Sequence, residues 1–321
     1  MLILEIFNST LTQMLVLFTF IAVGYFLRKS NLMPDESAGI LSKLETYFIV
    51  PALIIESFSK NFTLNNISEH YDLIIYSVVL MAVALIIAIP LSKVFGRLKG
   101  HSNNDPRYQS CIYAYALTFG NFAYMGNALA LGVLGEEGLF LYLLFTIVPN
   151  IAVYTWGFYI LIPKSVSKGN PLKNLLTPPV LSLGIGMVLG IFNLRQYMPT
   201  FITTTLGSAQ ACMGPIAMLL LGIVVGSYNF KELVIRRRVY TATLLRLIII
   251  PAFMLIMLKL FGTPKLILTL VLFAFASPLG LNTVVFPASY GADAKTGASM
   301  AMISHTVAVI TLPLMYLAFI A

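Results

Sequence analysis

The stretch FASPLGLNTVVFP, residues 275–287, places two prolines, a glycine and an asparagine within a long apolar region. Proline lacks the backbone donor that a helix needs, and glycine is a poor helix former. In a membrane interior each unsatisfied backbone group costs several kcal/mol, so irregular backbone is tolerated only where protein or water surrounds it. The stretch therefore predicts an interrupted membrane helix that is buried inside the protein.

The composition excludes a soluble domain. Hydrophobic residues make up 59% of the 321 residues, and charged residues only 10%. Several apolar stretches exceed the roughly 18 to 20 residues that a helix needs to cross a bilayer, and the alternating pattern of barrel strands is missing. The first apolar segment, 11–27, precedes the basic pair Arg28-Lys29, which is the reverse of a signal peptide. We therefore expect an all-α integral membrane protein that retains this first span.

Apolar windows separated by polar residues predict ten membrane spans. The spans are 11–28, 36–59, 71–96, 110–135, 137–162, 174–192, 202–227, 237–261, 265–290 and 293–319. The loops that follow odd-numbered spans carry most of the basic residues, including the run Arg236-Arg237-Arg238. Because basic loops stay in the cytoplasm, we expect a multi-pass protein of the cytoplasmic membrane with both termini outside.

The two halves of the chain, 1–162 and 163–321, resemble each other. Each carries a proline in its second span, Pro51 or Pro215, which we expect to act as a hinge or helix break. Each also has a glycine and asparagine interruption in its fourth span. Because each half holds five spans, the second half enters the membrane from the opposite side. This predicts two inverted five-helix repeats with matched interruptions in spans four and nine.

The matched interruptions, TFGNFAYMGNAL at 118–129 and SPLGLNTVVFP at 277–287, predict a binding site where the two spans cross. A helix broken at mid-membrane exposes N–H groups at the start of its second half, a partial positive charge that suits an anion. Asparagine amides tie off unpaired groups or contact the substrate, and glycines permit close approach. The candidate substrate-binding residues are Asn121, Gly126, Asn127, Pro278, Gly280 and Asn282, with Gly120 and Pro287 at the breaks. Ordinary proline kinks are the alternative for each break taken alone.

Five segments make the whole chain similar to the auxin efflux carrier family, which includes the plant PIN carriers and bacterial carriers associated with malate and malonate. They are VPALI at 50–54, GNFAYMGNALALGVLGEEGL at 120–139, GPIAMLLLGIVVG at 214–226, SPLGLNTVVFPASYGAD at 277–293 and TLPLMY at 311–316. Asn121 matches the family's crossover asparagine and Pro278 its crossover proline. The family often has proline where this chain has Gly120 and Ala128, so the first break is expected to differ in shape.

The resemblance implies an architecture like that of bile-acid symporters and of the NhaA antiporter, with crossed helices four and nine. It implies a scaffold built from helices one, two, six and seven, and a transport domain built from helices three to five and eight to ten. It also implies elevator-type alternating access, an anion held at the crossover and a homodimer formed through the scaffold.

Ionisable residues within spans are expensive and are therefore functional candidates. Arg246 lies deep in span eight, where it pairs with a substrate carboxylate or forms a scaffold salt bridge or a lipid headgroup contact. His305, in span ten, is a candidate for proton coupling, with a hydrogen-bonded packing role as the alternative. Glu56 lies near the end of span two, where it serves coupling, charge pairing or contact with water. Glu45 is expected at the membrane interface.

These features favour a secondary or facilitative transporter of a small organic anion, a mono- or dicarboxylate of auxin-like or malate-like type. A sodium-coupled symporter of bile-acid or keto-acid type is the first alternative, and a membrane receptor or intramembrane enzyme is the second. No catalytic set, P-loop or dinucleotide fingerprint is present in the sequence, so we expect no enzyme, cofactor or metal. Cys111 and Cys212 are expected to be packing residues, and the basic residues to contact membrane lipid and not nucleic acid. Proton or sodium coupling stays open.

Overall fold

The computed structural model describes residues 2–97, 106–161, 177–289 and 294–320, and these residues are almost entirely helical. The longest helices are α1 (Leu2–Lys29), α4 (Leu64–Arg97), α10 (Thr200–Gly226) and α16 (Lys295–Phe319), and α4 is kinked at His70, where φ is −125° and ψ is 19°. The others are α2 (Ser37–Leu44), α3 (Val50–Asn61), α5 (Pro106–Thr118), α6 (Asn127–Phe145), α7 (Ile147–Ala152), α8 (Phe158–Leu161), α9 (Pro178–Ile191), α11 (Phe230–Val234), α12 (Arg237–Leu244), α13 (Ile250–Leu260), α14 (Lys265–Phe275) and α15 (Asn282–Ser289). The predicted connector at 163–174 and the GAD sequence at 291–293 lie outside the described residues.

Seven helical segments in the described part of the chain are long and apolar enough to cross a membrane. They are Leu11–Lys29, Ser37–Asn61, Leu64–Gly96, Phe122–Phe145, Thr200–Gly226, Arg237–Leu260 and Lys295–Phe319. Three shorter apolar helices, Ile147–Leu161, Pro178–Ile191 and Lys265–Phe275, accompany them. The structure is therefore that of an all-helical protein with multiple candidate spans. Among the described residues, seven helices have the length and hydropathy of a span, and the expected number of ten stays a prediction.

The predicted boundary between spans four and five falls inside α6. Gly135 has a φ of 73° and a ψ of −168°, values that break the helical run within α6. Glycine adopts a positive φ readily because it has no Cβ. The helix therefore bends at the position where the sequence predicts a loop, and Glu136 follows directly after the bend.

Prolines within the helices have unequal effects. A π-helical turn, Glu45–Ile49, precedes Pro51, and a second one, Leu245–Ile249, precedes Pro251. Proline cannot donate the regular backbone bond, so a wider turn before it is a common local adjustment. By contrast, α10 continues past Pro215 as one helix, so this residue does not interrupt the helix in the way that its sequence context predicts. Pro287 likewise lies within α15.

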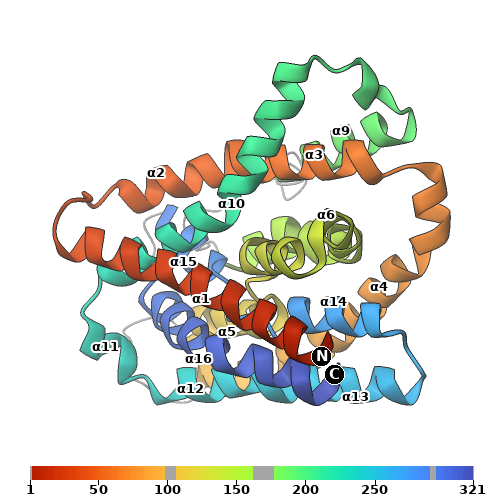
Figure 1. The fold of residues 1–321 in the computed structure, drawn as a ribbon. Helices are drawn as coiled ribbons and strands as arrows, with labels where there is room; N and C mark the ends of the chain where they lie inside the picture. Colours follow the sequence, from red (N-terminus) through yellow and green to blue (C-terminus); the bar gives the residue numbers. More distant parts are fainter. Residues whose placement is uncertain (1, 98–105, 162–176, 290–293, 321) are drawn as a thin grey trace.

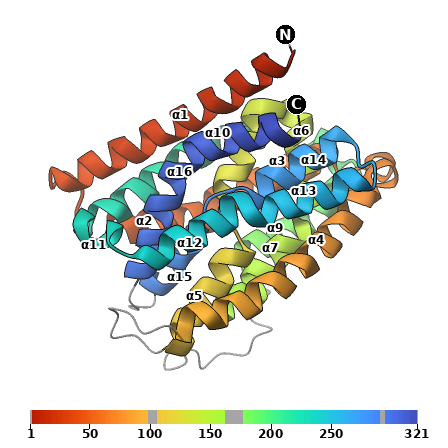
Figure 2. The same ribbon diagram turned by 90° about the horizontal axis from the view of Figure 1, so that it is seen from below.

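The helices associate as layers of inclined rods (Figure 1). α1 packs along α10, and α3 packs along α9. α4 contacts α5, α6 and α7, while α16 contacts α12 and α15. Figure 2 shows α1, α4, α16 and the run of α12 and α13 inclined in similar directions. The two ends of the chain lie on the same side of the molecule in both views.

Glycines bring α1 and α10 into close contact. A Cβ added to Gly222 would collide with the backbone of α1 at Ile21 and Tyr25, and one added to Gly24 would collide with the carbonyl of Leu219. Small residues at such crossings are typical of membrane helices, where van der Waals packing replaces the hydrophobic effect as the source of association. The contact between these two helices is therefore specified by the sequence of both.

Candidate functional site

Two helix interruptions meet in the interior of the protein. α5 ends at Thr118 and α14 ends at Phe275, and the next helical turns begin at Phe122 and at Asn282. Between them, Gly120 and Leu279 form an isolated antiparallel bridge, and the backbone N–H of Asn121 donates to the carbonyl of Pro278 at 2.6 Å. We call residues 119–121 and 276–281 the paired interruptions. They lie where the sequence places its irregular stretches.

Arg246 is the central polar side chain of the paired interruptions, and it is 1% exposed. Its Nη1 donates to the carbonyls of Leu117 and Thr118, both at 3.2 Å, and its Nη2 donates to the carbonyl of Ala274 at 2.9 Å. Its guanidinium also lies over the ring of Phe275. One side chain thus caps the C-terminal ends of α5 and α14.

The sequence explains why these carbonyls need an external donor. In an uninterrupted helix, the carbonyl of Ala274 would accept from the residue four positions later, which is Pro278 and has no N–H. The corresponding donor for Leu117 is Asn121, whose N–H is committed to Pro278. Arg246 therefore satisfies carbonyls that the interruptions leave open, and its positive charge offsets two negative helix ends. Among the described residues, the hydrogen bonds of its guanidinium go to these backbone carbonyls and not to a carboxylate.

Gly120 is required by this close packing. A Cβ at position 120 would collide with Nη2 of Arg246 and with both the hydroxyl and the carbonyl of Ser277. The hydroxyl of Ser277 also donates to the carbonyl of Ala274 at 2.8 Å. Any larger residue at position 120 would separate the two chains where they bridge. Gly280 is similarly close to the carbonyl of Phe119.

Asn121 and His305 form a buried hydrogen bond between the first interruption and α16. The distance from Nδ2 of Asn121 to Nε2 of His305 is 2.8 Å, and Nδ1 of His305 lies 2.7 Å from the carbonyl of Ala301. The carbonyl requires a proton on Nδ1, so Nε2 of a neutral ring accepts from the asparagine amide. The structure thus brings together two predicted site residues, while the backbone carbonyl of Asn121 starts the next helical turn by accepting from Met125 and Gly126.

Asn282 begins α15 and reaches back to α5. Its Nδ2 donates to the hydroxyl of Tyr115 at 2.9 Å. The N–H of Leu279 donates to the hydroxyl of Ser304, on α16, at 3.0 Å. The side-chain oxygens of Asn121, Asn127 and Asn282 are all buried without a hydrogen-bond partner among the described residues. Buried amide oxygens usually accept a hydrogen bond, so these three oxygens can accept from a water molecule or from an O–H or N–H group of a bound molecule.

Asn127 lines a cavity, and neither Asn121 nor Asn282 is among the residues in its wall. This cavity, which we call the Asn127 cavity, has a volume of about 220 Å³ and lies between α1, α3, α6 and α10. Gln13, Leu53 and Pro215 are also in its wall. Gly126 does not line it, because this residue packs against the hydroxyl of Tyr142. The predicted site residues thus divide between the buried interruptions and a neighbouring cavity.

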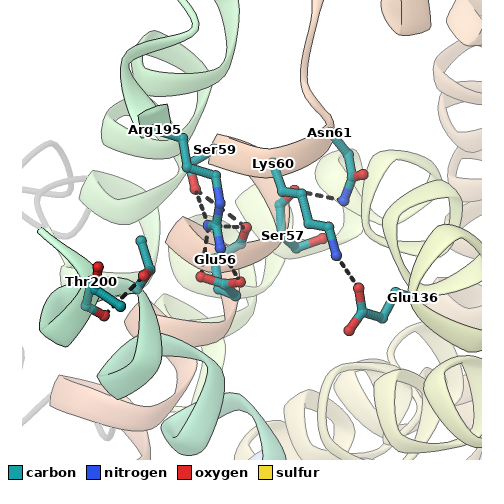
Figure 3. Close-up of polar contacts among 9 residues, drawn as sticks. Glu56, Ser57, Ser59, Lys60, Asn61, Glu136, Arg195 and Thr200 are labelled. Carbon is teal, nitrogen blue, oxygen red and sulfur yellow. Dashed lines mark hydrogen bonds and ion pairs between the residues drawn. The ribbon is translucent and has the colours of Figure 1, made fainter. Parts of the chain in front are cut away.

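A second cavity, the ion-pair cavity, has a volume of about 190 Å³ and lies at the end of α3. Glu56, Ser57, Lys60 and Glu136 are among its lining residues. Figure 3 shows Arg195 extending from the α9–α10 connection toward Glu56, with Lys60 paired to Glu136 on α6. Glu56 therefore has a charge-pairing role.

The sequence interpretation missed the ion-pair cavity and misplaced Glu45. Glu45 is fully buried, and neither of its carboxyl oxygens has a partner among the described residues, so it does not lie at an interface. The π-helical turn that contains it packs against α9 and α10, neither of which carries an acidic or basic side chain. The position two residues after Lys43, near the start of the predicted span, suggested the membrane interface, and the packing of α9 and α10 shows that Glu45 is buried.

Comparison with known proteins identifies the family of the chain. A family model described as membrane transport protein matches residues 9–316. An uncharacterized transporter of Methanocaldococcus jannaschii is 26% identical over 303 residues, which cover 94% of this chain and 96% of that protein. The residues matched by the family model include both interruptions and every candidate site residue. The chain therefore belongs to the membrane transport protein family, the auxin efflux carrier family that its interrupted helices resemble.

Proposed function

We propose that this membrane transporter is a secondary or facilitative carrier of a small organic anion, a mono- or dicarboxylate, in the cytoplasmic membrane. The anion binds beside the paired interruptions, close to Asn121 and Asn282, and reaches them from the cavity that Asn127 lines. The carrier has both termini outside and functions as a homodimer.

The arrangement of four helix ends at the paired interruptions carries this proposal. The two C-terminal ends, at Thr118 and Phe275, are capped by Arg246. The two N-terminal ends, at Phe122 and Asn282, have no acidic residue within the interruptions to offset them. The first N–H groups of a helix lack intrahelical partners and carry partial positive charge, so this side of the site favours an anion.

Helix packing supports an elevator-type movement of one bundle against another. α1 with α10, and α3 with α9, form extensive contacts that suit a fixed scaffold. The interrupted helices and α16 form the moving transport domain. The Asn127 cavity lies at the boundary, with α6 on one side and α1, α3 and α10 on the other. Two inverted repeats, 1–162 and 163–321, with crossed spans four and nine, account for this division in a ten-span topology.

Uptake of labelled succinate and lactate into liposomes that contain the purified protein tests the proposal. We expect flux above that of protein-free liposomes. Asn121→Ala and Asn282→Ala should each lower it by about tenfold, because each removes a hydrogen bond that the second N–H of the amide nitrogen donates to the anion. Asn65→Ala is the matched control, because Asn65 is exposed on α4 and should transport normally.

The same liposomes separate the alternatives. Uptake that requires a sodium gradient would favour the symporter, and uptake driven by a proton gradient would favour coupling through a group such as His305. A receptor or an intramembrane enzyme would give no flux with either gradient. Absence of anion flux across a panel of mono- and dicarboxylates would refute the carrier proposal.

A further inference from the structure

The ion-pair cavity adjoins the Asn127 cavity. Leu131, Leu139, Gln210 and Ala211 are in the walls of both. The ion-pair cavity is bounded by α3, α6 and α10, and the charged residues in its wall are Glu56, Lys60 and Glu136. An anion bound there would lie next to the cavity that Asn127 lines.

The two ion pairs near this cavity differ in solvent exposure and in the number of hydrogen bonds that hold them. Arg195 is held by both oxygens of Glu56, at 2.7 and 2.6 Å, and by the hydroxyl of Ser59 at 3.0 Å. Their side chains are 23% and 13% exposed, as expected of a fixed structural pair. In the described part of the chain, the ammonium of Lys60 forms an ion pair with Glu136, and these side chains are 47% and 64% exposed. Exposed ion pairs contribute little to stability, so Glu136 can be replaced at Lys60 by another carboxylate at low cost.

The cavity also holds polar atoms that lack partners. The hydroxyl of Ser57 and the side-chain oxygen of Gln210 are buried without a hydrogen-bond partner among the described residues. Ser57 is 5% exposed, and both residues are in the cavity wall. Buried polar groups of this kind usually bind water or a ligand. Ser57 and Gln210 line the same cavity as the ammonium of Lys60, and their unpartnered atoms are a second, independent indication that a polar ligand binds there.

We propose that Lys60 is a capture site for the carboxylate of the transported anion, and that Glu136 occupies this site when no substrate is bound. The proposal rests on the proposed carrier function. A substrate carboxylate displaces the carboxylate of Glu136 from the lysine. A second carboxylate of the substrate accepts from the hydroxyl of Ser57, and a substrate hydroxyl donates to the side-chain oxygen of Gln210. Lysine suits this role because its ammonium is a compact charge with three rotatable donors, which can bind carboxylates of differing geometry. Glu136, on α6, thereby acts as an internal competitor for Lys60, on α3.

Transport kinetics with succinate and lactate distinguish this role from a structural ion pair. Lys60→Gln should raise KM about fivefold, and Lys60→Arg should restore it, since a partly exposed ion pair supports a ratio of this size. Glu136→Gln should lower KM, because it removes the competitor. A purely structural pair would make both glutamine variants change KM in the same direction. Glu137→Gln is the matched control, because Glu137 is the exposed neighbour outside the cavity wall.

A second measurement does not depend on transport. Purified protein is treated with an amine-acylating reagent, and the modification of Lys60 is followed by mass spectrometry as succinate or lactate is added. The anions should protect Lys60 at lower concentration in Glu136→Gln than in the wild type. Lys43, which is exposed on α2, should gain no protection.

The outcomes separate the two proposals. Flux with opposite KM changes, or protection that strengthens in Glu136→Gln, supports the capture site. KM changes in the same direction, or changes no larger than that of Glu137→Gln, would overturn it. If the wild type shows no flux, the carrier proposal fails by itself, and protection of Lys60 then decides the capture site: its absence overturns this inference too.

Discussion

Removing the guanidinium of Arg246 should destabilise the protein at the paired interruptions. Arg246→Gln takes the donor from the carbonyls of Leu117, Thr118 and Ala274. A buried acceptor without its donor costs about 1–3 kcal/mol. Because the variant also removes the cost of burying a charge, we take the lower value of about 1 kcal/mol for each of the three carbonyls. We therefore expect the free energy of unfolding to fall by about 3 kcal/mol. Arg246→Lys should recover only part of it, since one ammonium cannot bridge two helix ends.

Trp156 is a local reporter for this experiment. It is the single tryptophan of the chain, and its ring centroid lies 5.7 Å from that of Phe119, the residue before Gly120. Unfolding of the purified protein in mixed micelles of increasing denaturing detergent can be followed by its fluorescence. We expect Arg246→Gln to unfold at lower detergent than the wild type and to show altered fluorescence before unfolding.

The control for Arg246 is Arg237→Gln, which removes the same charge from the exposed start of α12. Exposed substitutions of this type usually change stability by no more than about 0.5 kcal/mol. Equal transition midpoints for Arg246→Gln and Arg237→Gln, with unchanged Trp156 fluorescence, would refute the assignment of Arg246 as the cap of both helices.

Three further substitutions can be measured by the same unfolding assay. Gly120→Ala should lower the free energy of unfolding by about 1–3 kcal/mol, because the added Cβ collides with the backbone carbonyl of Ser277. Gly39→Ala is the control: nothing lies within 4 Å of its added Cβ, so it should be neutral or stabilising, and equal effects of the two substitutions would contradict the close approach at Gly120. Tyr115→Phe removes the hydrogen-bond partner of the Asn282 amide and should cost about 1 kcal/mol, so an unchanged midpoint would show that the bond is not formed. Glu45→Leu should leave stability unchanged or raise it by about 1–3 kcal/mol, because it removes a buried carboxyl that has no partner, and a clear loss would reveal a partner for Glu45.

Local residue chemistry accounts for what could be predicted. Pro278, Gly120 and Asn121 are incompatible with a regular buried helix, so they indicate where the helices break without reference to the rest of the chain. The repeated pattern in the two halves indicated that the breaks belong together. The membrane class follows from composition, and the family match confirms a membrane transporter. Substrate and coupling stay predictions.

The type of a residue did not predict which partner its polar side chain contacts. Arg246 was a candidate for substrate or scaffold, and Glu56 for coupling or pairing, because one sequence does not show what lies opposite a helix face. The fold places Arg246 against two helix ends and Glu56 against Arg195. It also brings Lys60 to Glu136, which is 76 positions away in the chain.

The sequence by itself determined the membrane class, the positions of the two interruptions and the residues that cause them, because backbone chemistry in an apolar medium is a local property. Only the tertiary structure decided which atoms pair where the interruptions meet, that one arginine caps both, and that Glu45 is buried. These outcomes depend on helices that are distant in the chain and adjacent in space, and the energy of a buried polar group is set by the atoms around it.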